Sequence, residues 1–134
     1  MKLSALMHAR GTFEVTLAPQ PGLADAVPGR MTIDKRFQGD LEGTSQGQML
    51  AAQTTVQGSA GYVAIERVRG TLAGRTGTFV LQHSGLMDRG KPELSIAVVP
   101  DSGTEGLTGL RGRMTILIEG GRHSYDFEYS LPPS

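Results

Sequence analysis

The number and placement of glycines constrain this chain more than any other feature. Its 134 residues include 19 glycines, about double the average usage. They follow no strict every-third-residue repeat over the chain, which excludes a collagen-like triple helix. Instead they separate short runs of β-forming residues, so the sequence predicts an all-β chain with many tight turns.

The runs between the glycines alternate apolar and polar residues, as half-buried strands do. At residues 123–131, for example, Tyr125, Phe127, Tyr129 and Leu131 alternate with polar residues. We expect eight strands, within the segments 11–17, 30–43, 44–56, 61–85 (two strands), 91–100, 113–120 and 123–131. Residues 18–29 and 101–112 read as loops, the second with room for one short helical turn.

Eight strands at regular spacing with no linker predict one domain over residues 1–134. Pairing of each strand with the next makes an all-β, up-and-down antiparallel barrel of the calycin-like kind, which also removes exposed edges. We expect this barrel to have an internal cavity.

The hairpin within residues 61–85 carries the most informative side chains. We predict a turn centred on Gly74 and Arg75, because glycine supplies the positive φ of tight hairpin turns. In that register Glu66 lies opposite His83, while a slip of one residue places Gln82 opposite Glu66. The face predicted to point inward comprises Tyr62, Ala64, Glu66, Val68, Phe79, Leu81 and His83.

A glutamate on an inward face suggests proton chemistry. Burial among apolar neighbours is expected to raise the pKa of Glu66, which suits a general acid or base near neutral pH. His83 is then a second proton carrier or a hydrogen-bond partner for Glu66. The competing interpretation is that a histidine or arginine only satisfies the buried polarity of Glu66. The candidate catalytic residues are Glu66 and His83, and the candidate ligand-binding residues are Tyr62, Phe79, Leu81 and Gln82.

Bulk composition argues against several classes of function. The 13 basic and 13 acidic residues give zero net charge, so we expect no nucleic-acid partner. No apolar run is long enough to cross a membrane, and the run at residues 3–7 is too short for a secretory signal, so we expect a cytoplasmic protein. The chain has no cysteine, its three histidines lie far apart, and it has no nucleotide-binding glycine motif; we therefore expect neither metal nor cofactor.

The segment GTSQG, residues 43–47, matches the G-x-S-x-G motif of serine hydrolases around Ser45. That motif places its serine on a sharp turn between a strand and a helix in a larger α/β domain. The sequence predicts no such context, so we do not expect a serine hydrolase.

Three motifs carry a resemblance to a known family: GTF at 11–13, ERVRGTLAGRTGTFVLQH at 66–83 and the segment 98–112. Together they resemble an uncharacterised family of short bacterial proteins within the allene oxide cyclase-like barrel superfamily. The resemblance implies an eight-stranded antiparallel barrel around a cavity, commonly in a homo-oligomer. In the wider superfamily, plant allene oxide cyclase and bacterial polyene cyclases rely on cavity shape and few polar groups. Their catalytic motifs do not align with residues 61–85, so no catalytic residue is transferred.

These observations predict a barrel that binds a small apolar molecule, as an isomerase or cyclase with Glu66 and His83 at its centre. Two alternatives remain open. One is a non-catalytic carrier or sensor of a hydrophobic ligand. The other is a barrel filled by its own side chains that serves as a structural or interaction module.

Overall fold

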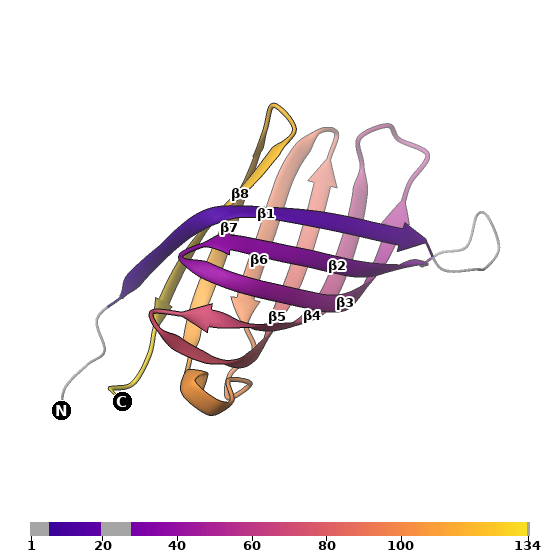
Figure 1. Cartoon of the computed structure of the whole chain (residues 1–134). Helices are drawn as coiled ribbons and strands as arrows, with labels where there is room; N and C mark the ends of the chain where they lie inside the picture. The colour runs from indigo at the N-terminus through magenta and orange to yellow at the C-terminus, as the bar shows by residue number, and fades with distance from the viewer. Residues whose placement is uncertain (1–5, 20–27, 134) are drawn as a thin grey trace.

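The chain forms a closed barrel of eight antiparallel strands, each paired with the next and β1 paired with β8 (Figure 1). The computed structural model describes residues 6–19 and 28–133. The strands are β1 (Met7–Pro19), β2 (Gly29–Gly39), β3 (Leu41–Gln53), β4 (Ala60–Leu72), β5 (Arg75–Asp88), β6 (Lys91–Val98), β7 (Arg111–Glu119) and β8 (Arg122–Ser130). This confirms the predicted fold class and the up-and-down strand order.

Two predicted boundaries are corrected. The expected strand 30–43 is divided, because β2 ends at Gly39 and β3 begins at Leu41. Gly39 has a φ of 110°, a conformation that side-chain-bearing residues rarely adopt, so the turn falls there and not near residue 43. The predicted loop 18–29 lies mostly outside the described residues, and its two ends are strand and not loop, because β1 continues to Pro19 and β2 begins at Gly29.

The β4–β5 hairpin has the predicted inward face but a different register. Its two-residue turn is Ala73-Gly74, with φ of 52° and 75°, and not Gly74-Arg75 as predicted. Every partner therefore moves by two residues, so that Glu66 pairs with Leu81, and His83 with Ala64. A shift of two preserves the side-chain alternation, which is why the inward face was predicted correctly.

One end of the barrel is filled by side chains of the protein. The β6–β7 connection contains a short 3₁₀ turn, η1 (Glu105–Leu107), and places Leu107 and Leu110 in the core with no exposed surface. A Cβ at Gly77 would lie 2.1 Å from the carbonyl oxygen of Thr104, so this glycine lets the connection pack against β5. The predicted loop with one helical turn is confirmed, and it closes this end.

The opposite end of the barrel is open, because two of the strand ladders stop early. β6 and β7 share only the pairs Ile96–Met114 and Ala97–Arg113. The β1–β8 ladder stops at Thr12–Ser124, although both β1 and the β7–β8 hairpin continue beyond it. The expected internal cavity stays a prediction. In the described part of the chain, no helix has the length and apolar character needed to cross a membrane.

The corrected hairpin register predicts the effect of mutating its turn. We expect Ala73→Gly to stabilise the protein by roughly 0.5 kcal/mol. Relief of about 1–2 kcal/mol of left-handed strain is partly offset by about 0.4–1 kcal/mol of added freedom in the unfolded chain. Urea unfolding measures the change, with Ala97→Gly in β6 as a strand control that should be destabilised. Destabilisation by Ala73→Gly would contradict the turn position.

Candidate functional site

Glu66 is the centre of a polar cluster inside the barrel, and its side chain has no exposed surface. Its Oε2 atom accepts hydrogen bonds from Lys35 Nζ at 2.8 Å and from His83 Nε2 at 2.5 Å. Its Oε1 atom accepts a hydrogen bond from Ser45 Oγ at 2.8 Å. The four residues come from β2, β3, β4 and β5, so the cluster ties four consecutive strands together.

Small residues on neighbouring strands make room for this cluster. Gly47 pairs with Glu66, and a Cβ at Gly47 would lie 2.8 Å from the Glu66 Cβ. His83 pairs with Ala64, whose methyl group occupies little of the interior. The glycine in β3 and the alanine in β4 therefore leave the space that the carboxylate and the imidazole fill.

The carboxyl group of Glu66 is ionised, contrary to the expectation from sequence. Burial alone would raise its pKa, but the hydrogen bond from His83 and the charge and hydrogen bond of Lys35 outweigh burial and lower the pKa to about 2. The predicted rise in pKa is therefore wrong, because the sequence interpretation lacked the ammonium group beside the carboxylate. Glu66 is a fixed negative charge and does not act as a general acid near neutral pH.

Lys35 and Ser45 are the members of the cluster that sequence reasoning missed. The Lys35 side chain is 8% exposed, and its ammonium group lies 5.2 Å from the centre of the Phe13 ring. A signal was present, because Lys35 shares the alternation phase of the inward residues Ile33 and Phe37. Ser45 lies within β3 and not on a turn between a strand and a helix, and its hydroxyl donates to Glu66.

The two ring nitrogens of His83 differ, because Nε2 is hydrogen-bonded to Glu66 and no hydrogen bond of Nδ1 occurs among the described residues. Because the ionised Glu66 can only accept, Nε2 of His83 carries a proton, which in a neutral imidazole leaves Nδ1 as the acceptor. Among the described residues, no hydrogen bond involves Nδ1, and no buried side-chain nitrogen or oxygen lacks a partner. Nδ1 therefore reaches accessible space and is not sealed in the core.

An apolar pocket of about 370 Å³ lies at the open end of the barrel, and His83 is not among the residues that line it. Tyr62 lines the pocket, and its ring centre is 6.3 Å from that of His83. A Cβ at Gly85 would lie 2.4 Å from the Tyr62 ring, so Gly85 allows the ring to cross β5. Burial, and then the charge of Glu66, raise the pKa of Tyr62, which keeps its hydroxyl protonated and able to donate.

The other predicted ligand-binding residues lie elsewhere. Phe79 and Leu81 face inward but are wholly buried in the core, where Phe79 stacks on Phe127 at 5.9 Å between ring centres. Gln82 pairs with Ile65 and is exposed on the outer face, so the one-residue slip does not occur. The structure thus brings together Glu66, His83 and Tyr62 from the predicted set.

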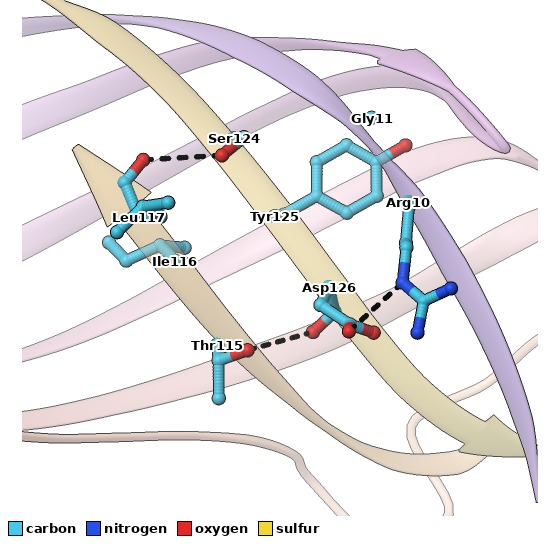
Figure 2. Close-up of a pocket in the computed structure, with 8 residues that line it drawn as sticks. All are labelled: Arg10, Gly11, Thr115, Ile116, Leu117, Ser124, Tyr125 and Asp126. Atoms are coloured by element: carbon cyan, nitrogen blue, oxygen red, sulfur yellow. Dashed lines mark hydrogen bonds and ion pairs between the residues drawn. The ribbon is translucent and has the colours of Figure 1, made fainter. Parts of the chain in front are cut away.

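A larger hollow of about 500 Å³ is lined by residues of β1, β7 and β8 and has a different character (Figure 2). There Arg10 pairs with Asp126 at 3.1 Å, and His8 bonds the same carboxylate at 2.8 Å. The His8 hydrogen bond is the main cause of the lowered pKa of Asp126. These exposed charges already satisfy one another, which makes this hollow a weaker candidate. The described residues also contain no group of three or more acidic or histidine side chains that could hold a metal ion.

Comparison with known proteins identifies a family whose function is unknown. The model of a family of proteins of unknown function, DUF3224, matches residues 9–129. A crystal structure at 1.84 Å resolution of a DUF3224 protein of unknown function from Shewanella oneidensis MR-1 is similar to this chain, with a TM-score of 0.90 and 50% sequence identity. The match covers 97% of this chain and all of that one. None of the curated proteins compared with the chain matches it.

The ionised state of Glu66 predicts a specific pH dependence of stability. Its pKa in the folded protein, about 2, lies below its ordinary value of 4.5. Its stabilisation is therefore complete above about pH 4.5 and is lost as the pH falls toward 2. We expect the free-energy difference between wild type and Glu66→Gln to shrink by on the order of 3 kcal/mol over that range. Urea unfolding at several pH values measures it, and Glu14→Gln controls for net charge. A difference that is independent of pH would contradict an ionised Glu66.

Mutual dependence of Lys35 and Glu66 predicts a coupled response to mutation. Lys35→Met leaves the buried carboxylate without its cation, and we expect a loss of roughly 3–5 kcal/mol in unfolding free energy. The double variant Lys35→Met/Glu66→Gln removes both charges and should be less destabilised than the sum of the single variants. Denaturant unfolding of all four proteins gives the coupling energy. Additive effects would show that the ion pair does not form.

Proposed function

This chain belongs to the DUF3224 family of proteins of unknown function, and we propose that it is a small-molecule-binding barrel in which His83 transfers a proton during isomerisation or cyclisation of an apolar substrate. The observation that carries the proposal is a histidine held by a buried, ionised glutamate, with its ring centre 6.3 Å from that of Tyr62, which lines an apolar pocket. In a general-base site, a carboxylate of this kind orients the histidine that accepts the proton from the substrate.

The groups suit a substrate with an enolisable carbonyl. The Tyr62 hydroxyl donates a hydrogen bond to the carbonyl oxygen, and His83 Nδ1 takes a proton from the adjacent carbon. The C–H electron pair then forms the enolate double bond, and the carbonyl π electrons move to oxygen. When the substrate carries a β,γ double bond, the proton returns from Nδ1 to the γ-carbon of the dienolate, the carbonyl re-forms and the double bond moves to the α,β position, which completes an isomerisation without a co-reactant. The negative charge of Glu66 stabilises the imidazolium formed in between.

The neighbours of Glu66 determine which group carries the proton. Lys35 holds the Glu66 carboxyl in its ionised form, so the proton taken from the substrate stays on His83. The roles expected from sequence are therefore revised: His83 is the proposed catalytic base, and Glu66 orients it. The resemblance to allene oxide cyclase-like barrels supports an isomerase or cyclase, since few polar groups suffice for such reactions. A cytoplasmic location and a homo-oligomer belong to the same proposal.

A carrier without catalysis is the second candidate. It is favoured by the pocket itself, whose lining is largely apolar and would hold a hydrophobic ligand without any reaction. The third possibility is a structural module whose whole interior is filled by its own side chains. It is favoured by the filled end of the barrel, where Leu41, Leu72 and Phe79 are fully buried.

The proposal predicts binding and proton exchange of a simple ketone. We would incubate the protein with 2-octanone, recording thermal shift and, in D₂O, hydrogen exchange beside the carbonyl by NMR. A ligand at 100 times its Kd stabilises by about 2.7 kcal/mol, which a thermal shift detects. We expect wild type to catalyse exchange and His83→Gln to slow the catalysed rate by roughly 10²–10⁴-fold.

Gln82→Ala is the matched control, because Gln82 is the adjacent residue on the outer face of the same strand. It should bind and exchange like wild type. Binding without exchange would favour the carrier. No binding of the ketone by wild type would contradict both the enzyme and the carrier proposals.

A further inference from the structure

We infer that the ligand is chain-like, with its oxygen-bearing head at Tyr62 and His83 and an unbranched apolar tail in the gap between β6 and β7. This inference rests on the proposed function and specifies the substrate class of the same site. It follows from where the barrel wall is incomplete and from what lines that opening.

The wall is interrupted on one side of the pocket. β5 and β6 share eight residue pairs, from Leu81–Val98 to Asp88–Lys91, whereas β6 and β7 share two. Beyond Ile96 and Met114, the residues 91–95 of β6 and 115–119 of β7 have no ladder partner in each other. At the filled end the β6–β7 connection packs over the barrel, so the gap opens only beside the pocket.

The gap is lined by apolar side chains on both sides. Pro92 and Leu94 of β6 and Ile116 and Ile118 of β7 all line the pocket. Leu94 is 42% exposed and Ile118 is 61% exposed. Apolar surface of this kind is stabilised by contact with another apolar group. Because these residues continue the pocket wall, an apolar tail extending from the pocket would cover them.

The interior directs the ligand toward this gap. Between the pocket and the filled end of the barrel, Ile96 and Met114 are buried where they form the last pair of the β6–β7 ladder. Val68 and Leu81 fill the interior closer to the filled end. A ligand longer than the pocket therefore cannot extend deeper. Of the described residues that line the pocket, Glu93 is the only charged one, so the lining favours an uncharged hydrocarbon tail.

A disulfide across the gap tests this route. Continuation of the β6–β7 register by one further same-face pair would place Leu94 opposite Ile116. Residues paired in an antiparallel ladder have Cα atoms about 4.5–5.5 Å apart, whereas Leu94 and Ile116 lie outside the ladder; a disulfide, which needs Cα atoms within about 7 Å, therefore holds the two strands together at this point. The chain contains no cysteine, so Leu94→Cys/Ile116→Cys gives one defined bond that closes the gap on oxidation and reopens it on reduction.

Binding of 2-hexanone and 2-dodecanone is then measured by titration calorimetry. For wild type and the reduced double variant, we expect the Kd of 2-dodecanone to be at least 10-fold lower than that of 2-hexanone. Oxidation should weaken 2-dodecanone binding at least 10-fold and change 2-hexanone binding less than twofold. Equal Kd values for the two ketones in wild type, or unchanged 2-dodecanone binding after oxidation, would overturn the tail route and leave the proposed function standing. Failure of wild type to bind either ketone would overturn both.

A second variant keeps the test independent of disulfide formation. Ile118→Glu places a carboxylate on the gap-lining face of β7, and we expect at least 10-fold weaker binding of 2-dodecanone with 2-hexanone unaffected. Leu117→Glu, on the adjacent exposed residue, controls for charge and stability. Equal 2-dodecanone binding by the two variants would contradict a tail in the gap.

Discussion

A buried negative charge organises this barrel. Glu66 has no exposed surface, and an isolated carboxylate in such a place would be strongly destabilising. It is tolerated because Lys35, Ser45 and His83 each donate to it, from three different strands. Pairing of β2, β3, β4 and β5 in one register is therefore required for the charge to be compensated. In return, the charge holds the imidazole of His83 in one orientation.

The cluster lies between two halves of the barrel that differ in kind. Toward η1, aromatic and aliphatic side chains fill the interior, and the β6–β7 connection packs over them. Toward the opposite end, the β6–β7 and β1–β8 ladders stop, and an apolar pocket opens beside Tyr62. The filled half supplies stability, so the open half can leave apolar surface uncovered. A histidine nitrogen at the boundary is accessible without loss of the core.

Local pattern was sufficient to predict much of this architecture. Glycine spacing and alternation predicted eight strands and a barrel, and alternation placed Glu66, His83 and Tyr62 on one inward face. The predicted inward face was correct although the predicted turn was not, because a register shift of two residues leaves each side chain on the same face of the sheet. The turn itself was missed because Ala73, a residue that rarely adopts positive φ, takes that conformation.

The charge state of Glu66 could not be predicted from the hairpin alone. It depends on Lys35, which lies 31 residues away in the sequence and reaches Glu66 across β3. Such a contact requires knowledge of how three strands are paired. The gap between β6 and β7 could not be predicted either, because it depends on where the ladder between the two strands stops. The sequences of residues 91–98 and 111–119 alternate like those of regular strands and do not mark that point.

The protonation of the His83 ring is the most direct measure of this account. Nitrogen NMR of ¹⁵N-histidine-labelled protein, with His83 assigned by its loss in His83→Gln, distinguishes the two nitrogens at a pH where the ring is neutral. We expect that Nε2 carries the proton, donated to an ionised Glu66, and that Nδ1 is unprotonated. A ring protonated on Nδ1 would mean that Nε2 accepts a proton from a neutral glutamic acid, and would contradict both the fixed charge and the proposed base.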